Sequence, residues 1–259
     1  MGIDLNSLNG YYVGLTPNVK LNNYGKFVYF GNTQNLDTFQ NSSPVRLFEE
    51  AEIKKMIANS PDVQKILSEH KIPVRLNMKE LHELRDGHAK DTQDIAVAIA
   101  NNLPPALRQQ VNIKDLKDGA LLHDFGKVLI PPEILNKNGS LTDAEHKIMD
   151  LHTELGYYLL KASGVNDKVL DLVRNHHDNY LDNTSGRNYV PDINLQILNI
   201  ADKYSALTEK RVYKDAYAPK SALTVIYGDV QRGEVHPFLF TALVKATMDS
   251  DPMLNVKKV

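Results

Sequence analysis

A histidine and an aspartate stand side by side near the middle of the chain, at His123 and Asp124. They follow Ala120–Leu122, helix-forming residues that we expect to be buried. A buried imidazole and carboxylate need partners, and a divalent metal ion is a natural one because neutral imidazole and ionised carboxylate are metal ligands. A hydrogen-bonded His–Asp pair at a helix end is the alternative for these two residues alone. Lys127 would share a helical face with Asp124, where it could contact a phosphate or a metal-bound water.

Other histidines, and a second aspartate, recur on segments that we predict to be helical. Asp202 interrupts the apolar run Ile197–Ala201, and a buried aspartate needs a partner or a metal ion. Each residue alone has an ordinary explanation, such as a solvated histidine or a hydrogen-bonded core carboxylate. Together they predict one metal site. Its predicted ligands are His88, His123, Asp124, His152, His176, His177 and Asp202.

The composition is that of an ordinary globular protein, with 42% hydrophobic and 24% charged residues among 259. A net charge of −2 gives no general footprint for a nucleic acid polymer. The absence of cysteine excludes disulfides and thiolate metal sites. The first residues lack the features of a signal peptide, and no apolar run approaches membrane-spanning length. We therefore expect a cytoplasmic protein with no membrane partner.

The elements that must position the candidate ligands are predominantly helical after residue 76. Thr142 and Glu145 are spaced as a capping box. The predicted helices cover 78–102, 115–127, 142–162, 165–177, 194–208, 221–232 and 237–247. Short connections between so many helices predict an all-α bundle over residues 76–247, followed by a tail at 248–259.

Residues 1–75 have a different character. Tyr11–Leu15 and Lys26–Phe30 are predicted short strands joined through turn residues. Short helices should follow, one of them after Ser60-Pro61-Asp62. We expect a small α+β region whose role the sequence does not name; ligand binding and formation of a homodimer are both open to it.

The order His, His-Asp, His, His-His, Asp resembles the HD superfamily of metal-dependent phosphohydrolases, and within it the HD-GYP group. The resemblance covers about residues 80–246. It rests on these segments: Gly87-His88, His123-Asp-Phe-Gly-Lys127, His152-Thr-Glu-Leu-Gly156, Asn175-His-His-Asp178, Ala201-Asp202-Lys-Tyr-Ser-Ala-Leu207, Arg211-Val-Tyr-Lys214 and His236-Pro237. HD-GYP proteins are all-α and hydrolyse cyclic di-GMP or related bacterial cyclic dinucleotides.

The resemblance also implies roles for individual residues. His88, His123, Asp124 and Asp202 would hold one metal ion. Asp124 would bridge to a second ion held by three histidines, His152, His176 and His177. Arg211 and Lys214 would meet substrate phosphates, although a solvated basic patch is the alternative for that pair.

Two departures from the family pattern affect these expectations. The signature loop is altered: Asp178 replaces a glutamate, and Gly186, Tyr189 and Pro191 are a stretched remnant of Gly-Tyr-Pro. The identity of the nucleotide therefore stays open. Members with three metals use a glutamate one turn before the first histidine, where this chain has Leu84. Glu83 is one residue away, about 100° around a helix, so we expect two metal ions.

The expected activity is hydrolysis of a cyclic dinucleotide by a hydroxide that bridges two ions. An imidazole-rich site with a bridging carboxylate favours iron or manganese over magnesium or calcium. Asp124 would hold both ions, and Lys127 would position the hydroxide or stabilise the phosphorus centre. The alternatives are a phosphohydrolase acting on nucleotide monophosphates or other phosphoesters, and a catalytically silent module that binds cyclic dinucleotides in signalling.

Overall fold

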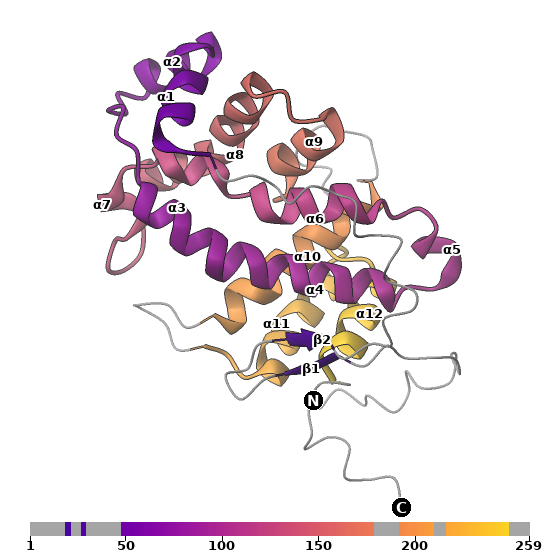
Figure 1. Cartoon of the computed structure of the whole chain (residues 1–259). Coiled ribbons are helices and arrows are strands. Elements are labelled where there is room, and N and C mark those ends of the chain that lie inside the picture. Colours follow the sequence, from indigo (N-terminus) through magenta and orange to yellow (C-terminus); the bar gives the residue numbers. More distant parts are fainter. Residues whose placement is uncertain (1–18, 22–26, 30–47, 179–191, 210–215, 249–259) are drawn as a thin grey trace, which may run out of the picture.

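The computed structural model describes residues 19–21, 27–29, 48–178, 192–209 and 216–248, and helices dominate this part of the chain (Figure 1). The α-helices are α1 (Glu50–Ala58), α2 (Pro61–Glu69), α3 (Met78–Leu84), α4 (Lys90–Asn101), α5 (Pro105–Arg108), α6 (Ile113–Leu122), α7 (Pro132–Leu135), α8 (Asp143–Ala162), α9 (Asp167–Asn175), α10 (Ile193–Thr208), α11 (Pro219–Gln231) and α12 (Pro237–Met248). A π-helical segment, η4 (Arg85–Ala89), joins α3 to α4, and a 3₁₀ segment, η5 (Phe125–Leu129), follows α6. The predicted all-helical bundle is confirmed.

Two three-residue strands precede the helices. β1 (Val19–Leu21) and β2 (Phe27–Tyr29) pair antiparallel, with Val19 opposite Tyr29. The second lies within the strand predicted over 26–30, whereas the strand predicted over 11–15 falls outside the described residues. The α+β character of the N-terminal region therefore rests here on one short hairpin.

Local sequence signals place several helix starts correctly. Thr142 and Glu145 form the predicted capping box at the start of α8. The Ser60 side chain accepts a hydrogen bond from the backbone of Val63 at the start of α2. No described helix is long and apolar enough to cross a lipid bilayer.

Two predicted helices end differently from expectation. The helix expected over 115–127 stops at Leu122, and the chain turns at His123 and Asp124 into η5. The helix expected to run to His177 ends at Asn175. The helix expected over 78–102 is continuous in outline but widens into the π-helical turn at 85–89. All three differences fall at predicted metal ligands, which local propensity does not position.

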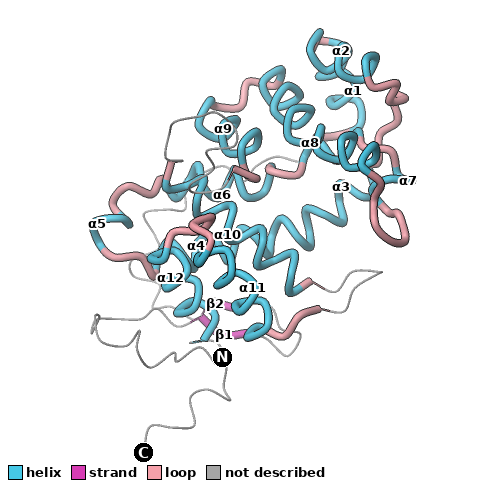
Figure 2. The backbone as a smooth tube through the Cα atoms, turned by 180° about the vertical axis from the view of Figure 1, so that it is seen from behind, coloured by secondary structure: helices cyan, strands magenta, loops and turns pink. Residues whose placement is uncertain are grey.

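The helices form two hydrophobic cores at opposite ends of the molecule (Figures 1 and 2). The first core joins α4, α6, α10, α11 and α12, with Ile99, Leu198 and Leu243 fully buried. The second joins α1, α2, η5, α8 and most of the buried face of α9, with Ile53, Leu155 and Leu159 fully buried. Each such side chain contributes about 1.5–3 kcal/mol through burial. Helices α1 and α2 share a core with α8, so side-chain packing continues across residue 75. The division into domains at that residue stays a prediction.

Candidate metal centre

The seven predicted ligands lie on elements from both cores. The first core's side supplies His88 from η4 and Asp202 from α10. The second supplies His152 from α8, and the turn after α9 supplies His176 and His177. His123 and Asp124 lie between them, where α6 gives way to η5. Three overlapping groups of these side chains could each hold a metal ion: His88–His123–Asp202, His123–Asp124–His176 and His152–His176–His177.

The carboxylate of Asp124 faces two ways. Its Oδ2 atom lies 3.4 Å from Nε2 of His123 and 3.8 Å from Nε2 of His88. Its Oδ1 atom lies 3.5 Å from Nε2 of His152 and 4.0 Å from Nε2 of His176. Oδ2 therefore faces His88 and His123, and Oδ1 faces His152 and His176 on the side of the second core. A carboxylate placed in this way could contact a cation on each side.

Backbone carbonyls fix the orientation of three histidine rings. Nδ1 of His123 lies 2.8 Å from the Ala120 carbonyl oxygen, Nδ1 of His152 lies 2.7 Å from that of Met149, and Nδ1 of His176 lies 2.9 Å from that of Val173. A carbonyl only accepts, so each Nδ1 carries a proton and each ring turns Nε2 toward the centre. His123 and His176 directly follow helices, where carbonyls of the last turn need donors.

The Nε2 atoms of His152, His176 and His177, called here the three-histidine group, lie too close for neutral rings without a shared partner. Nε2 of His152 is 3.3 Å from Nε2 of both His176 and His177. Since the rings of His152 and His176 carry their protons on Nδ1, their lone pairs oppose one another. Two nitrogens bound to one first-row ion at about 2.0–2.1 Å stand about 3.0–3.4 Å apart. Nε2 of fully buried His123 also has no hydrogen-bond partner. The donor set therefore fits metal ions.

The electrostatics hold most of these groups in the protonation states that ligands require. Burial lowers the pKa of His152 to about 4 and lowers the pKa of His176 well below its usual range, so both rings are neutral at pH 7. Burial opposes ionisation of Asp124, but Lys127 and His123 outweigh it and lower the pKa of that carboxyl. His123 is the exception: burial lowers its pKa, yet Asp124 and Asp202 raise it to about 10. A metal ion at Nε2 would take the place of that proton.

Two glycines allow the His123–Asp124 turn to approach α8. A Cβ atom on Gly126 would overlap the His152 carbonyl oxygen and lie 2.5 Å from the backbone nitrogen of Gly156. A Cβ on Gly156 would lie 3.1 Å from the backbone nitrogen of Gly126. Only glycine fits so close a backbone contact. The glycines of these two motifs thus bring Asp124 within reach of His152.

Asn199 supports the turn that carries the paired histidines, and the sequence analysis missed it. Its side-chain nitrogen donates to the carbonyl oxygens of His176 at 3.0 Å and Asp178 at 3.3 Å. It is buried on α10, three residues before Asp202. A polar residue inside the apolar run 197–201 was the available signal, the same one that identified Asp202.

Lys127 lies where the sequence predicted, although on a 3₁₀ segment. Its ammonium nitrogen is 2.6 Å from Oδ2 of Asp124. Glu83 pairs instead with Lys79 on the exposed face of α3, at 3.5 Å, away from the centre. Arg211, Lys214 and the loop 179–191 fall outside the described residues, so their predicted roles stay predictions.

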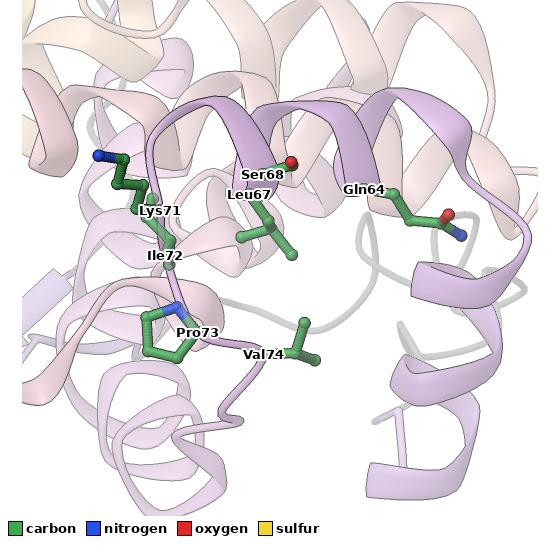
Figure 3. A pocket seen from close by; sticks show the side chains of 7 residues that line it. All are labelled: Gln64, Leu67, Ser68, Lys71, Ile72, Pro73 and Val74. Atoms are coloured by element: carbon green, nitrogen blue, oxygen red, sulfur yellow. The ribbon is translucent and has the colours of Figure 1, made fainter.

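A hollow of about 470 Å³ adjoins the three-histidine group at His177. Its lining residues are Asp150, Thr153, Glu154, Arg174, Asn175, His177 and Asp178. Arg174 pairs with Glu154 at 3.1 Å and lies over the Tyr157 ring. A second, more apolar hollow of about 370 Å³ lies beside the C-terminal end of α2 (Figure 3), and none of its lining residues is a candidate ligand.

Residues 85–207 match the family described as "HD domain", a span that contains all seven candidate ligands. The chain carries an HD domain. It is related to the HD-GYP phosphodiesterases, as the order of the motifs implied. The HD domain is a phosphohydrolase domain, and its buried His and Asp groups are consistent with the metal binding typical of such domains.

Curated relatives carry the names of cyclic-dinucleotide phosphodiesterases. The chain is 33% identical over 135 residues to the "Cyclic di-GMP phosphodiesterase response regulator RpfG" of Xanthomonas campestris pv. campestris, covering 48% of this chain and 33% of the relative. It is 26% identical over 165 residues to the "3'3'-cGAMP-specific phosphodiesterase 1" of Vibrio cholerae serotype O1, covering 61% and 37%. The matches thus span about a third of each relative.

A solved structure, the HD domain of the L. monocytogenes phosphodiesterase PgpH in complex with cyclic-di-AMP, aligns with a TM-score of 0.48 at 16% identity. The alignment covers 81% of this chain and 99% of that one.

Proposed function

We propose that this protein is a metal-dependent phosphodiesterase that hydrolyses a cyclic dinucleotide. The observation that carries the proposal is the position of Asp124, whose two carboxylate oxygens face two separate groups of imidazoles. His88, His123 and Asp202 would hold one ion with Oδ2 of Asp124. His152, His176 and His177 would hold the other with Oδ1. We therefore propose a centre for two ions, and three groups of His and Asp side chains that could hold a metal support it.

The donor set narrows the choice of ion. Five imidazoles and two carboxylates favour first-row transition metals, and iron or manganese is our proposal. When bound, such a pair supplies an activated water and neutralises the charge of a phosphodiester. Magnesium and calcium fit less well because they prefer a shell of oxygen ligands.

The chain's own residues prepare the centre for an anionic substrate. We propose that Lys127, paired with Asp124, keeps that carboxylate ionised and contributes positive charge beside the scissile phosphate. Its side chain is 17% exposed, so a substrate could reach it. We further propose that Arg211 and Lys214 bind the flanking phosphates.

The substrate class is supported by the relatives and by the space beside the centre. The relatives named above act, by their names, on cyclic di-GMP and 3'3'-cGAMP. The hollow beside His177 is large enough for a base or a sugar of a bound dinucleotide, and Arg174 offers donors there. The altered residues 178–191 leave open which bases are accepted.

Product analysis tests the proposal directly. Protein loaded with iron or manganese is incubated with cyclic di-GMP, cyclic di-AMP and 3'3'-cGAMP, and in parallel with nucleotide monophosphates and a chromogenic phosphodiester; products are separated by chromatography. We expect a linear dinucleotide from at least one cyclic substrate, and none from Asp124→Ala. Dephosphorylation of monophosphates alone would support the general phosphohydrolase instead. Bound metal and bound cyclic dinucleotide without turnover would support the silent signalling module.

A further inference from the structure

Helix α10 contacts both ring nitrogens of His88. Oδ1 of Asp202 lies 2.9 Å from Nε2, on the side of the ring that faces the centre. On the opposite side, Oγ of Ser205 lies 3.2 Å from Nδ1, and Oε2 of Glu209 lies 3.7 Å from the same nitrogen. Asp202, Ser205 and Glu209 are spaced i, i+3 and i+7, so they share one face of the helical path.

This support differs from that of the other ligands. Nδ1 of His123, His152 and His176 meets a carbonyl three residues earlier in its own chain segment. Nδ1 of His88 meets side chains more than a hundred residues away. His88 also lies in the π-helical turn η4, which changes the path of the helix at this residue.

We propose that Ser205 and Glu209 are positioning residues for the ion held by His88, His123 and Asp202. The inference rests on the proposed two-ion centre. When Nε2 binds an ion, the proton of the neutral ring is on Nδ1 and needs an acceptor. The oxygen of the Ser205 hydroxyl accepts a hydrogen bond from this N–H. The Glu209 carboxylate, at 3.7 Å too distant for a strong hydrogen bond, stabilises the polarised N–H electrostatically and so helps to hold the ring in place.

Ser205 and Glu209 should affect the ion at His88 more than the ion at His152, His176 and His177. Ser205 and Glu209 lie on the Nδ1 side of His88. The three-histidine group instead has backbone acceptors for His152 and His176 and the contact with Asn199. Loss of an outer acceptor typically costs about 10–100-fold in metal affinity. We therefore expect Ser205→Ala combined with Glu209→Gln to weaken one ion by that factor and to leave the other within about threefold.

The experiment measures bound metal and needs no turnover. Full-length wild type and the double variant are loaded with manganese and dialysed against graded chelator, and the ions retained per chain are counted by mass spectrometry. Cobalt-loaded samples give a second readout, because their visible spectrum reports the ligand field of the bound ions, the one at His88 included. The matched control is Glu83→Gln. It removes an exposed glutamate charge whose carboxylate lies 3.5 Å from the ammonium of Lys79.

The inference predicts that the double variant loses one ion at lower chelator concentration and shows an altered cobalt spectrum, while the control matches wild type. Unchanged retention and an unchanged spectrum would overturn it while leaving the two-ion centre intact. Equal weakening of both ions would also overturn it. If wild type itself retained no ions, the proposed function would fail together with the inference.

Discussion

The two halves of the candidate centre are built differently. On the side of the first core, His88 and Asp202 meet directly, and side chains of α10 hold the outer nitrogen of His88. On the side of the second core, three imidazoles converge in a group that includes no carboxylate among the described residues, and backbone carbonyls hold His152 and His176. The first half thus depends on side-chain identity, and the second depends on the path of the backbone.

Asp124 is where the two halves meet. It contributes one oxygen to each half, and its position depends on the close contact between Gly126 and Gly156. A change of a side chain in one half should therefore disturb that half, whereas a change at Asp124 or in the backbone beneath it should disturb both halves or move them apart.

Asp124→Asn should have the largest effect on the centre. The amide keeps one weak oxygen ligand and loses the charge that both halves use, so the affinity for both ions should fall by more than about 100-fold, beyond a typical outer-shell effect. Metal content after gel filtration measures it. Asp118→Asn on α6, which breaks only an exposed-edge pair with Lys114, is the control and should retain both ions. Retention of either ion at wild-type affinity by Asp124→Asn would contradict a bridging role.

Gly126→Ala should be the most destabilising of these changes for the fold. The added methyl group would overlap the backbone of α8, and overpacking of a rigid core costs about 1–3 kcal/mol or more. Urea unfolding measures the free energy. At Gly228 in α11, a Cβ would meet only the guanidinium of the exposed Arg232 side chain, at 3.4 Å, so Gly228→Ala should match wild type or exceed it in stability by about 1 kcal/mol. Equal stabilities for the two variants would argue against the tight η5–α8 contact.

Asn199→Ala should weaken the second half selectively. The substitution leaves the carbonyls of His176 and Asp178 without their amide donor, so the turn should loosen and one ion should be held about 10–100-fold less tightly. Chelator titration checks this. Asn102→Ala, which removes an amide bonded to the Ala98 carbonyl at the far end of α4, is the control. A loss of the ion on the His88 side instead would show that the two halves are not separable in this way.

The pH dependence of metal binding, which comes from a proton released by His123, should be the smallest of these effects. Asp124 and Asp202 raise the pKa of His123 to about 10, against the opposing effect of burial, so the metal-free ring is protonated at pH 7. An ion at Nε2 must displace this proton. Binding should release about one proton from His123 and weaken about tenfold per unit as pH falls. Calorimetry in buffers of different ionisation heat measures the release; identical heats would contradict it.

The sequence predicted the bundle and all seven residues that the structure brings together. This was possible because helical periodicity, the Thr142–Glu145 capping box and the choice of His and Asp are local properties. Asp202 was visible because a carboxylate inside an apolar run needs a partner. Asn199 gave the same signal two residues into that run and was overlooked.

The turns that aim the ligands could not be predicted in this way. The end of α6 at Leu122 depends on a backbone contact between Gly126 and Gly156, thirty residues apart. The π-helical turn at His88 lies against α10, more than a hundred residues further on. Local propensity favoured an uninterrupted helix in both places, and tertiary contacts overrode it.

Anomalous diffraction from crystals grown with manganese would locate the bound ions directly. We expect two peaks about 3.5–4 Å apart, one bounded by His88, His123 and Asp202 and the other by His152, His176 and His177, with Asp124 between them. A single peak, or peaks away from Asp124, would contradict this expectation.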